Sequence, residues 1–193
     1  MGDEALDGIG AARTVLLLAS RRERRGDEIC GRLLSPAPAS ELGVIYVTLM
    51  HPPAHRVEHW DEYGCGPPAD LVVVAAGNAA DRDADAATDY HVRRLPDPSN
   101  LTKLGVAMTE SLDEVADHTP VVCFHSLSIL LQYVNVEQAF QFVSVLGHHF
   151  ESAGARGHFH MDPKAHDEQT LATLEQVFDA IVELEDGEYS VIT

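Results

Sequence analysis

Basic residues are scarce in this chain of 193 residues. Its 13 Lys and Arg stand against 31 Asp and Glu, which gives a formal net charge of -18. Non-specific binding of nucleic acid needs clustered Lys and Arg to neutralise phosphates, so this balance argues against a nucleic-acid partner. A surface this acidic suits a cytoplasm with molar salt, where screening removes most of the self-repulsion. We therefore expect a halophilic source.

Cysteine is also scarce, with Cys30, Cys65 and Cys123 as the three examples. Their number is odd and their spacing fits no paired-cysteine metal motif, so a reducing compartment is the default expectation. Cys123 lies inside a predicted core strand and is expected to be a small buried apolar residue. Cys65 stands between two glycines and is predicted to be a plain loop thiol.

Long apolar runs are missing as well. No segment approaches the roughly 18 residues that a membrane-spanning helix needs, and the N-terminus lacks a charged-then-apolar signal pattern. We predict a cytoplasmic protein without a membrane partner. A hydrophobic content of 45% in a chain of this length suffices for one domain with a sizeable core. We expect a lead-in at residues 1–13 and a single domain over residues 14–193.

The most informative stretch is residues 120–134, PVVCFHSLSILLQYV. Its short apolar run at 121–124 is typical of a parallel strand that is buried on both faces. The polar pair His125 and Ser126 follows directly. Polar residues at the carboxyl end of such a strand lie where open α/β sheets place their ligands. This stretch is therefore the first candidate for a functional site.

Apolar runs alternate with helical patterns along the rest of the chain. We predict strands at residues 14–20, 43–49, 71–75, 91–94, 121–124 and 157–161. We predict helices at residues 28–34, 55–60, 101–108 (continuing or restarting over 109–115), 135–150 and 167–178. Residues 180–184 and 189–192 are expected to close the domain as a hairpin. This order favours one α/β domain with a mainly parallel sheet.

The order of elements resembles the RecA/KaiC-like ATPase superfamily, in which a first strand leads into a phosphate loop and a later strand ends in Asp followed by Ser. More narrowly, the second half is similar to a haloarchaeal KaiC-like family of unknown function. The matching stretches are residues 98–102, 125–134, 157–163, 166–167 and 174–180. The resemblance implies a three-layer RecA-like (P-loop NTPase-like) domain. It also implies a possible homo-oligomer, since RecA-like domains commonly assemble.

The sequence departs from the pattern of this superfamily at two positions that would bind a nucleotide. A working phosphate loop reads GxxxxGK[ST], and its Lys neutralises the phosphates. Here Gly26 is followed by Asp27, which would repel them. The strand-end Asp that would hold the magnesium shell is replaced by His125, a poor ligand for a hard cation. We predict that hydrolysis of Mg-ATP is absent and name no catalytic residue.

The degenerate nucleotide-site positions are Ser20, Arg24, Arg25, Gly26, Asp27, His125 and Ser126. The leading interpretation is a non-hydrolysing regulatory or signal-transduction protein that acts through protein contacts and needs no cofactor. The first alternative is an ATP-binding protein or weak ATPase whose arginine loop, with Arg21 and Arg22, replaces the missing Lys. The second is a metal-binding protein built on His125, His158 and His160, since two histidines two apart on a strand share one face.

Overall fold

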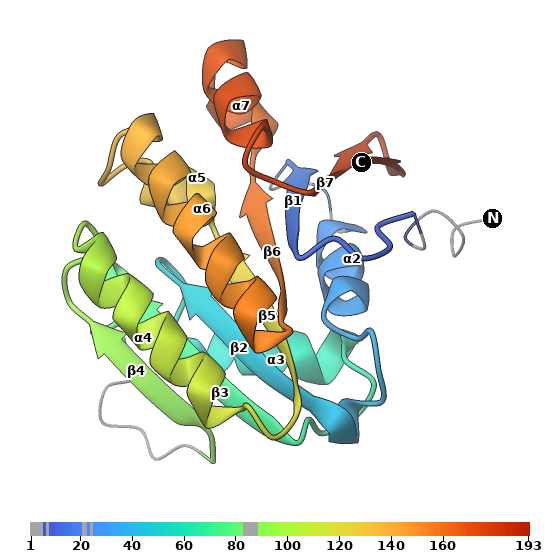
Figure 1. Cartoon of the computed structure of the whole chain (residues 1–193), viewed down its shortest axis with the longest axis vertical. Helices are drawn as coiled ribbons and strands as arrows, with labels where there is room; N and C mark the ends of the chain where they lie inside the picture. The colour runs from blue at the N-terminus through green and yellow to red at the C-terminus, as the bar shows by residue number, and fades with distance from the viewer. Residues whose placement is uncertain (1–5, 7, 21–22, 24, 83–88) are drawn as a thin grey trace.

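The structure is a computed structural model that describes residues 6, 8–20, 23, 25–82 and 89–193. Within these ranges, eight strands form one sheet in the order β4-β3-β2-β5-β6-β1-β7-β8 (Figure 1). All neighbouring pairs are parallel except β7 and β8, which form an antiparallel hairpin. The strands are β1 (Thr14–Ala19), β2 (Leu42–Thr48), β3 (Asp70–Ala76), β4 (His91–Leu95), β5 (Thr119–His125), β6 (Arg156–Met161), β7 (Ala180–Glu185) and β8 (Glu188–Ile192). The prediction of an α/β fold with a mainly parallel sheet and a C-terminal hairpin is confirmed.

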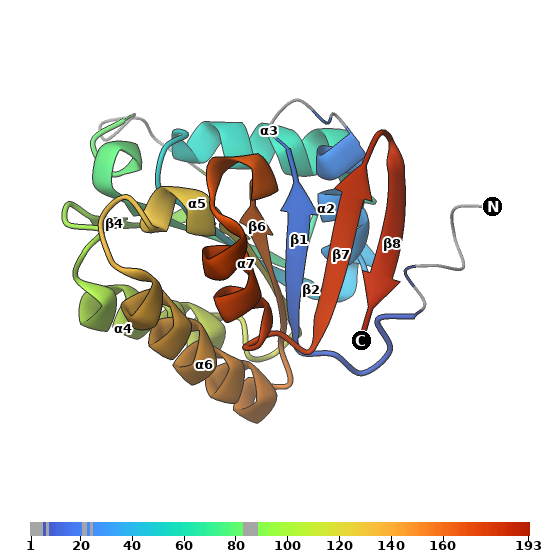
Figure 2. The ribbon, with the colours of Figure 1, turned by 90° about the horizontal axis from the view of Figure 1, so that it is seen from above.

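Helices cover both faces of the sheet and produce three layers (Figure 2). One face carries α4 (Leu101–Glu114), α5 (Leu127–Leu130), α6 (Val136–Ala153) and α7 (Glu168–Glu175), and the other carries α2 (Arg25–Leu33) and α3 (Pro53–Tyr63). The first core includes Phe124, Phe142 and Phe159, and the second includes Cys30, Tyr46 and Trp60. The central strands are buried on both faces, and all seven residues of β2 are buried. This explains why they read as unbroken apolar runs.

The helix that follows β1 begins earlier than predicted. It starts at Arg25, so Gly26 and Asp27 belong to its first turn rather than to the preceding loop. Asp27 and Glu28 in that turn complement the positive end of the helix dipole, which favours the early start. The short helix α5 was not predicted: no element was assigned to the apolar residues after Ser126. Residues 101–114 form a single helix, capped by the side chain of Asn100.

Helix α6 is held at both ends and packs closely on β6. Asn135 and Gln138 form a reciprocal capping box at its start, and Gly154 ends it with a φ of 66°. Gly157 of β6 lets the helix approach the strand, because a Cβ at this position would lie 2.2 Å from Cε2 of Phe150. The position therefore tolerates no side chain without a shift of the helix.

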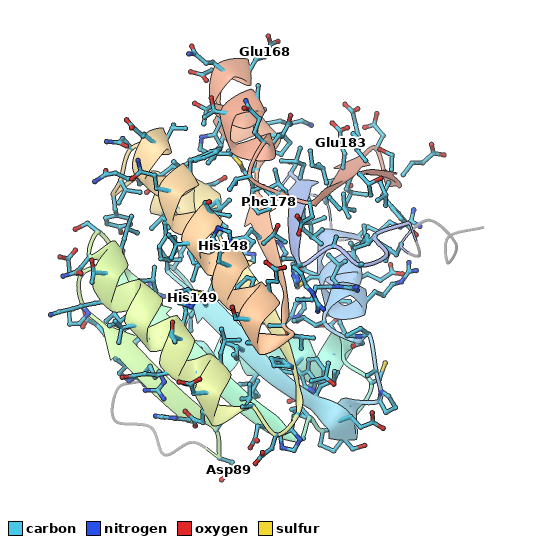
Figure 3. All side chains as sticks on the ribbon, in the orientation of Figure 1. Asp89, His148, His149, Glu168, Phe178 and Glu183 are labelled. Carbon is cyan, nitrogen blue, oxygen red and sulfur yellow. The ribbon has the colours of Figure 1, made fainter. Side chains whose placement is uncertain are left out.

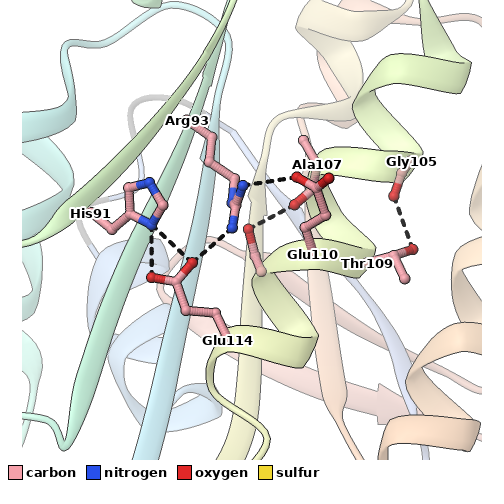
Figure 4. A network of polar contacts seen from close by, with 8 residues as sticks. His91, Arg93, Gly105, Ala107, Thr109, Glu110 and Glu114 are labelled. Atoms are coloured by element: carbon pink, nitrogen blue, oxygen red, sulfur yellow. Dashed lines mark hydrogen bonds and ion pairs between the residues drawn. The ribbon is translucent and has the colours of Figure 1, made fainter.

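A polar network attaches the edge strand β4 to α4 (Figure 4). Arg93 contacts Glu110 and Glu114 at 2.8 Å each, and Nδ1 of His91 lies 2.7 Å from Glu114. Charged side chains on an edge strand also discourage pairing with another sheet.

The described part of the expected lead-in packs on the domain. Ile9 is buried, and the guanidinium of Arg156 donates to the carbonyl oxygens of Gly10 and Ala12. The carboxylate of Asp179 accepts hydrogen bonds from the backbone amides of Arg13 and Thr14 and from the Thr14 hydroxyl. These contacts join the start of β1 to the chain that enters β7.

Candidate functional site

The parallel strands β1, β2, β5 and β6 end at the same edge of the sheet, and a polar cavity lies there. It encloses about 340 Å³, at the lower end of the usual range for ligand pockets of roughly 300–1,000 Å³. The loop after β1, the first turn of α2, the start of α3 and the residues that follow β2, β5 and β6 line it. This is the place where an open α/β sheet is expected to bind a ligand.

Most of the site residues predicted from the sequence meet in this cavity. Ser20, Gly26, Asp27, His125 and Ser126 all line it. They come from two strand ends that β6 alone separates in the sheet. The carboxyl-edge rule explains why these side chains lie together, but it did not show which other groups would line the cavity.

The structure describes one arginine of the predicted arginine loop, Arg25. Arg24 lies outside the described residues, as do Arg21 and Arg22. Arg25 points away from the cavity: its guanidinium donates to the carbonyl oxygen of Gly187 and lies 5.5 Å from the ring centroid of Tyr189. Because Arg25 is the first residue of α2, its side chain reaches the β7–β8 hairpin. The expectation that Arg25 meets an anion at the nucleotide position is thus corrected.

Arg56 brings a cation to the cavity that sequence reasoning missed. Its side chain is 2% exposed and comes from α3. Its Nη2 donates to Nδ1 of His55 at 2.7 Å, whereas Nε and Nη1 have no hydrogen-bond partner among the described residues. Buried guanidinium groups are normally paired, so two unpartnered nitrogens mark an incomplete site. A lone Arg in a short predicted helix gave no signal of this role.

Histidines form a second part of the lining. The rings of His51 and His55 stack at 4.6 Å, and the ring centroid of His125 lies 4.5 Å from that of His160. Loss of hydration at the end of β5, followed by the nearby His160 and Arg56, holds the pKa of His125 well below its usual value. The imidazole at the end of β5 is therefore neutral at pH 7.

A chain of hydrogen bonds fixes α2 against α3 beside the cavity. Nε2 of His59 lies 3.2 Å from the carbonyl oxygen of Asp27, and its Nδ1 lies 3.1 Å from the hydroxyl of Tyr46. A carbonyl only accepts, so Nε2 donates and Nδ1 accepts from Tyr46. Burial lowers the pKa of His59, in agreement with this neutral tautomer. The backbone of Asp27 is thus held in place.

Ser128 links the loop after β5 to the loop after β6. Its hydroxyl oxygen accepts from the backbone amide of Asp162 at 2.9 Å and lies 2.8 Å from Nε2 of His166. His166 therefore faces Ser128. Of the predicted metal ligands, His158 and His160 are both buried on the α2 side of the sheet.

A compact cluster of sulfur and nitrogen atoms lies beneath the cavity. Cys30, Cys123, His158 and His160 each offer one ligand atom, and the four atoms lie within 4.8 Å of one another. His160 belongs both to this cluster and to the cavity lining. His125 was predicted as a ligand but is not one of the four. The sequence indicated the two histidines, whereas the spacing of the cysteines fits no metal motif and gave no indication that Cys30 and Cys123 meet.

The fold and the site define an α/β protein whose mainly parallel sheet holds a polar cavity at its carboxyl edge. The chain belongs to a family of unknown function, DUF7504, which matches residues 12–184. A comparison with curated proteins found no match. Among the residues that the structure describes, none of the helices combines the length and the hydropathy that crossing a bilayer requires.

Two solved structures from Pyrococcus horikoshii are similar to this chain. One is the structure studied as project PH0250 from Pyrococcus horikoshii OT3, with a TM-score of 0.65, 14% identity and coverage of 99% of this chain and 91% of that chain. The other is the uncharacterised protein PH0321 in complex with an unknown peptide, with a TM-score of 0.64, 13% identity and coverage of 98% and 87%. At these identities the similarity concerns the fold.

Proposed function

We propose that this protein is a RecA/KaiC-like domain that does not hydrolyse ATP and that acts in regulation or signalling through protein contacts. The observation that carries the proposal is the charge of the cavity. Asp27 and His125 occupy the positions where the family resemblance calls for Lys and Asp, and both line it. Glu23 and Asp162 add two further carboxyl groups to the lining. A triphosphate placed here would face these carboxylates and a neutral imidazole, and Arg56 is the only Lys or Arg among the described residues that line the cavity.

The magnesium ligand that the resemblance places at the end of β5 is also missing, although carboxylates lie elsewhere in the cavity lining. Mg²⁺ binds proteins through carboxylates and keeps several waters, and imidazole is a poor ligand for it. His125 is neutral but offers nitrogen in place of oxygen. Hydrolysis of ATP depends on a metal that bridges the β- and γ-phosphates, together with cations that neutralise developing charge. At these two positions, His125 does not supply the strand-end carboxylate for the metal, and Asp27 does not supply the cation of the phosphate loop.

The proposal of protein contacts rests on a groove between α4 and α6. It encloses about 670 Å³ and is lined mostly by apolar and uncharged side chains, including Val106 and Val145, which are each 53% exposed. Among the described residues that line the groove, Glu110 is the only Asp, Glu, Lys or Arg, and Arg93 pairs with it. Depletion of charge within an exposed apolar patch is typical of a protein interface.

The groove differs from the rest of the surface, which is acidic. The chain has a formal net charge of -18, and side chains such as Glu168 and Glu183 lie at the outside of the molecule (Figure 3). His148 and His149 lie on α6 in the same view, and His149 lines the groove. We assign the groove to an apolar segment of a partner protein. Molar salt, the environment that we propose for this protein, would strengthen such an apolar contact.

Calorimetry with the full chain tests the proposal. Mg-ATP titrated into the protein in molar salt should give no saturable heat, with ADP and Mg²⁺ alone as further titrants. Capture experiments at the same salt should retain one protein in stoichiometric amount. Saturable heat from Mg-ATP together with release of phosphate would overturn the proposal.

The second candidate is an ATP-binding protein with a non-standard phosphate site, and Arg56 favours it. Its two unpartnered guanidinium nitrogens belong to the cavity, where an anion would satisfy them. The same calorimetry separates the two functions. If Mg-ATP binds, Arg56→Met should abolish the heat, whereas Arg94→Met should keep it, because the Arg94 guanidinium donates to carbonyl oxygens at Ala80 and Arg82, outside the cavity.

A further inference from the structure

Three elements far apart in the chain bring two thiols and two imidazoles together. Cys30 comes from the middle of α2, Cys123 from β5, and His158 and His160 from β6. The parallel register makes Cys123 and His158 direct neighbours, and alternation along β6 puts His160 on the same face. Neither cysteine is part of a disulfide, and all four side chains are buried.

Two of the distances within the cluster are close to those inside a tetrahedral zinc site, and all four ligand atoms lie within 4.8 Å of one another. With Zn–S near 2.3 Å and Zn–N near 2.05 Å, a tetrahedron has S···S edges of about 3.8 Å and S···N edges of about 3.6 Å. The two sulfur atoms lie 3.6 Å apart, and Nε2 of His158 lies 3.1 Å from Sγ of Cys30. A metal ion would enter with shifts of a few tenths of an ångström at these atoms.

His160 supplies an independent indication. Its Nε2 is buried and has no hydrogen-bond partner in the part of the chain that the structure describes. A buried polar atom left unsatisfied costs roughly 1–3 kcal/mol, so such atoms normally have a partner. A metal ion bound by the other three side chains would provide that partner without any change of the fold.

We propose that Cys30, Cys123, His158 and His160 bind a zinc ion. Two sulfur and two nitrogen ligands in a tetrahedral arrangement select zinc over magnesium and calcium, which require oxygen ligands. Each thiol releases its proton to solvent when its sulfur binds the metal. Four protein ligands leave no open position, so the ion has a structural role rather than a catalytic one.

The expected role of the metal is to fasten α2 to the sheet. Cys30 is its attachment point on the helix, and the other three ligands lie on adjacent strands. The first turn of the helix contains Gly26 and Asp27, which line the cavity. Zinc would therefore hold the cavity wall in place without touching a ligand inside it. The proposal is independent of whether a nucleotide binds.

Metal analysis of the wild-type protein is the first test. Protein purified at native salt without chelators should contain about one zinc per chain. After the zinc is removed and Co²⁺ is added, the absorption spectrum should show thiolate-to-cobalt charge transfer and the visible bands of a tetrahedral site. A folded wild-type protein that takes up neither ion in stoichiometric amount would overturn the proposal. So would a Cys30–Cys123 disulfide found in protein purified under reducing conditions.

Variants locate the site. Cys30→Ser and His160→Gln should each lower zinc affinity at least tenfold, as measured by competition with a chromophoric chelator. Cys65→Ser and His148→Gln change an exposed cysteine and an exposed histidine and should retain the wild-type metal content. Equal zinc content in all four variants would place the metal elsewhere. If the ligand variants fail to fold, the charge-transfer intensity of the Co²⁺-loaded wild type still decides the matter, because it must correspond to two thiolates.

Discussion

Cys123 of β5 and His158 of β6 are register partners in the parallel sheet. This pairing puts a thiol and an imidazole side by side on the face that α2 covers, and it adds His160 two residues further along β6. A slip of one residue would turn both histidines to the other face, into the core that contains Phe124 and Phe159. The cluster under the cavity is therefore a consequence of strand register.

Restoring the missing cation should restore nucleotide affinity. Asp27→Lys replaces a carboxylate that lines the cavity by the charge that the phosphate loop of RecA/KaiC-like ATPases carries. A charge-assisted hydrogen bond contributes about 1.5–3 kcal/mol, so the affinity for Mg-ATP should rise at least about tenfold. Calorimetry in molar salt measures this change.

Glu28→Lys is the matched control for that experiment. It makes the same change of charge in the same turn of α2, but Glu28 is exposed and does not line the cavity. The control should leave nucleotide affinity near the wild-type value. An equal rise in both variants would show that the effect is one of overall charge, and the cavity would lose its assignment as a degenerate nucleotide site.

Placing a charge in the groove between α4 and α6 should abolish capture of the partner. Val145→Asp buries a carboxylate in any complex formed there, whereas the free protein keeps its stability within about 0.5 kcal/mol because Val145 is 53% exposed. Ala172→Asp adds the same charge on the exposed side of α7 and should not affect capture. Sedimentation of both variants and of the wild type would show whether a second copy of this chain occupies the groove. Undiminished capture by Val145→Asp would remove the groove from the proposal.

Asp179 should make stability depend on pH. Partial burial acts to raise the pKa of its carboxyl group, but the hydrogen bonds from Thr14 and Arg13 outweigh burial and lower it. A folded-state pKa below the unfolded value of about 3.9 means that the stabilisation is fully present above that value and is lost as pH falls through the folded pKa.

The comparison of Asp179→Asn with wild type measures this dependence. The variant should be about 1 kcal/mol less stable at pH 7, a figure reduced for solvent exposure, and the difference should shrink below about pH 4. Chemical denaturation across this pH range gives both quantities. Glu183→Gln, on an exposed position of β7, serves as control and should stay close to wild type at pH 7. A difference between Asp179→Asn and wild type that does not change with pH would contradict the assignment.

Gly157 and Gly105 should respond to alanine in opposite ways. At Gly157 a Cβ would lie 2.2 Å from the buried ring of Phe150, so Gly157→Ala should lower the free energy of unfolding by about 1–3 kcal/mol or more. At Gly105, inside α4, the nearest atom would be 3.8 Å away. Gly105→Ala should therefore raise the free energy of unfolding by about 0.5–1 kcal/mol. Thermal unfolding of both variants checks this, and a stable Gly157→Ala protein would show that α6 packs less closely on β6.

The sequence by itself determined the order of strands and helices, the closing hairpin and the edge where the cavity lies. Those features follow from local patterns: apolar runs of strand length, capping residues such as Asn100 and Asn135, and polar residues at the ends of parallel strands. His125 and Ser126 could be assigned to the site for that reason. Burial of Cys123 followed in the same way from its place in a core strand.

Only the tertiary structure decided which side chains complete the site. Arg56 enters the cavity, and Cys30 reaches Cys123, because α2 and α3 dock at particular positions on one face of the sheet. Docking of this kind depends on packing between segments far apart in the chain, such as the contact of His59 with Asp27 and Tyr46. The alternation of side chains along β6 predicts that His158 and His160 share a face of the sheet. It does not predict which helix covers that face. The packing of α2 on this face brings the two thiols next to the two imidazoles.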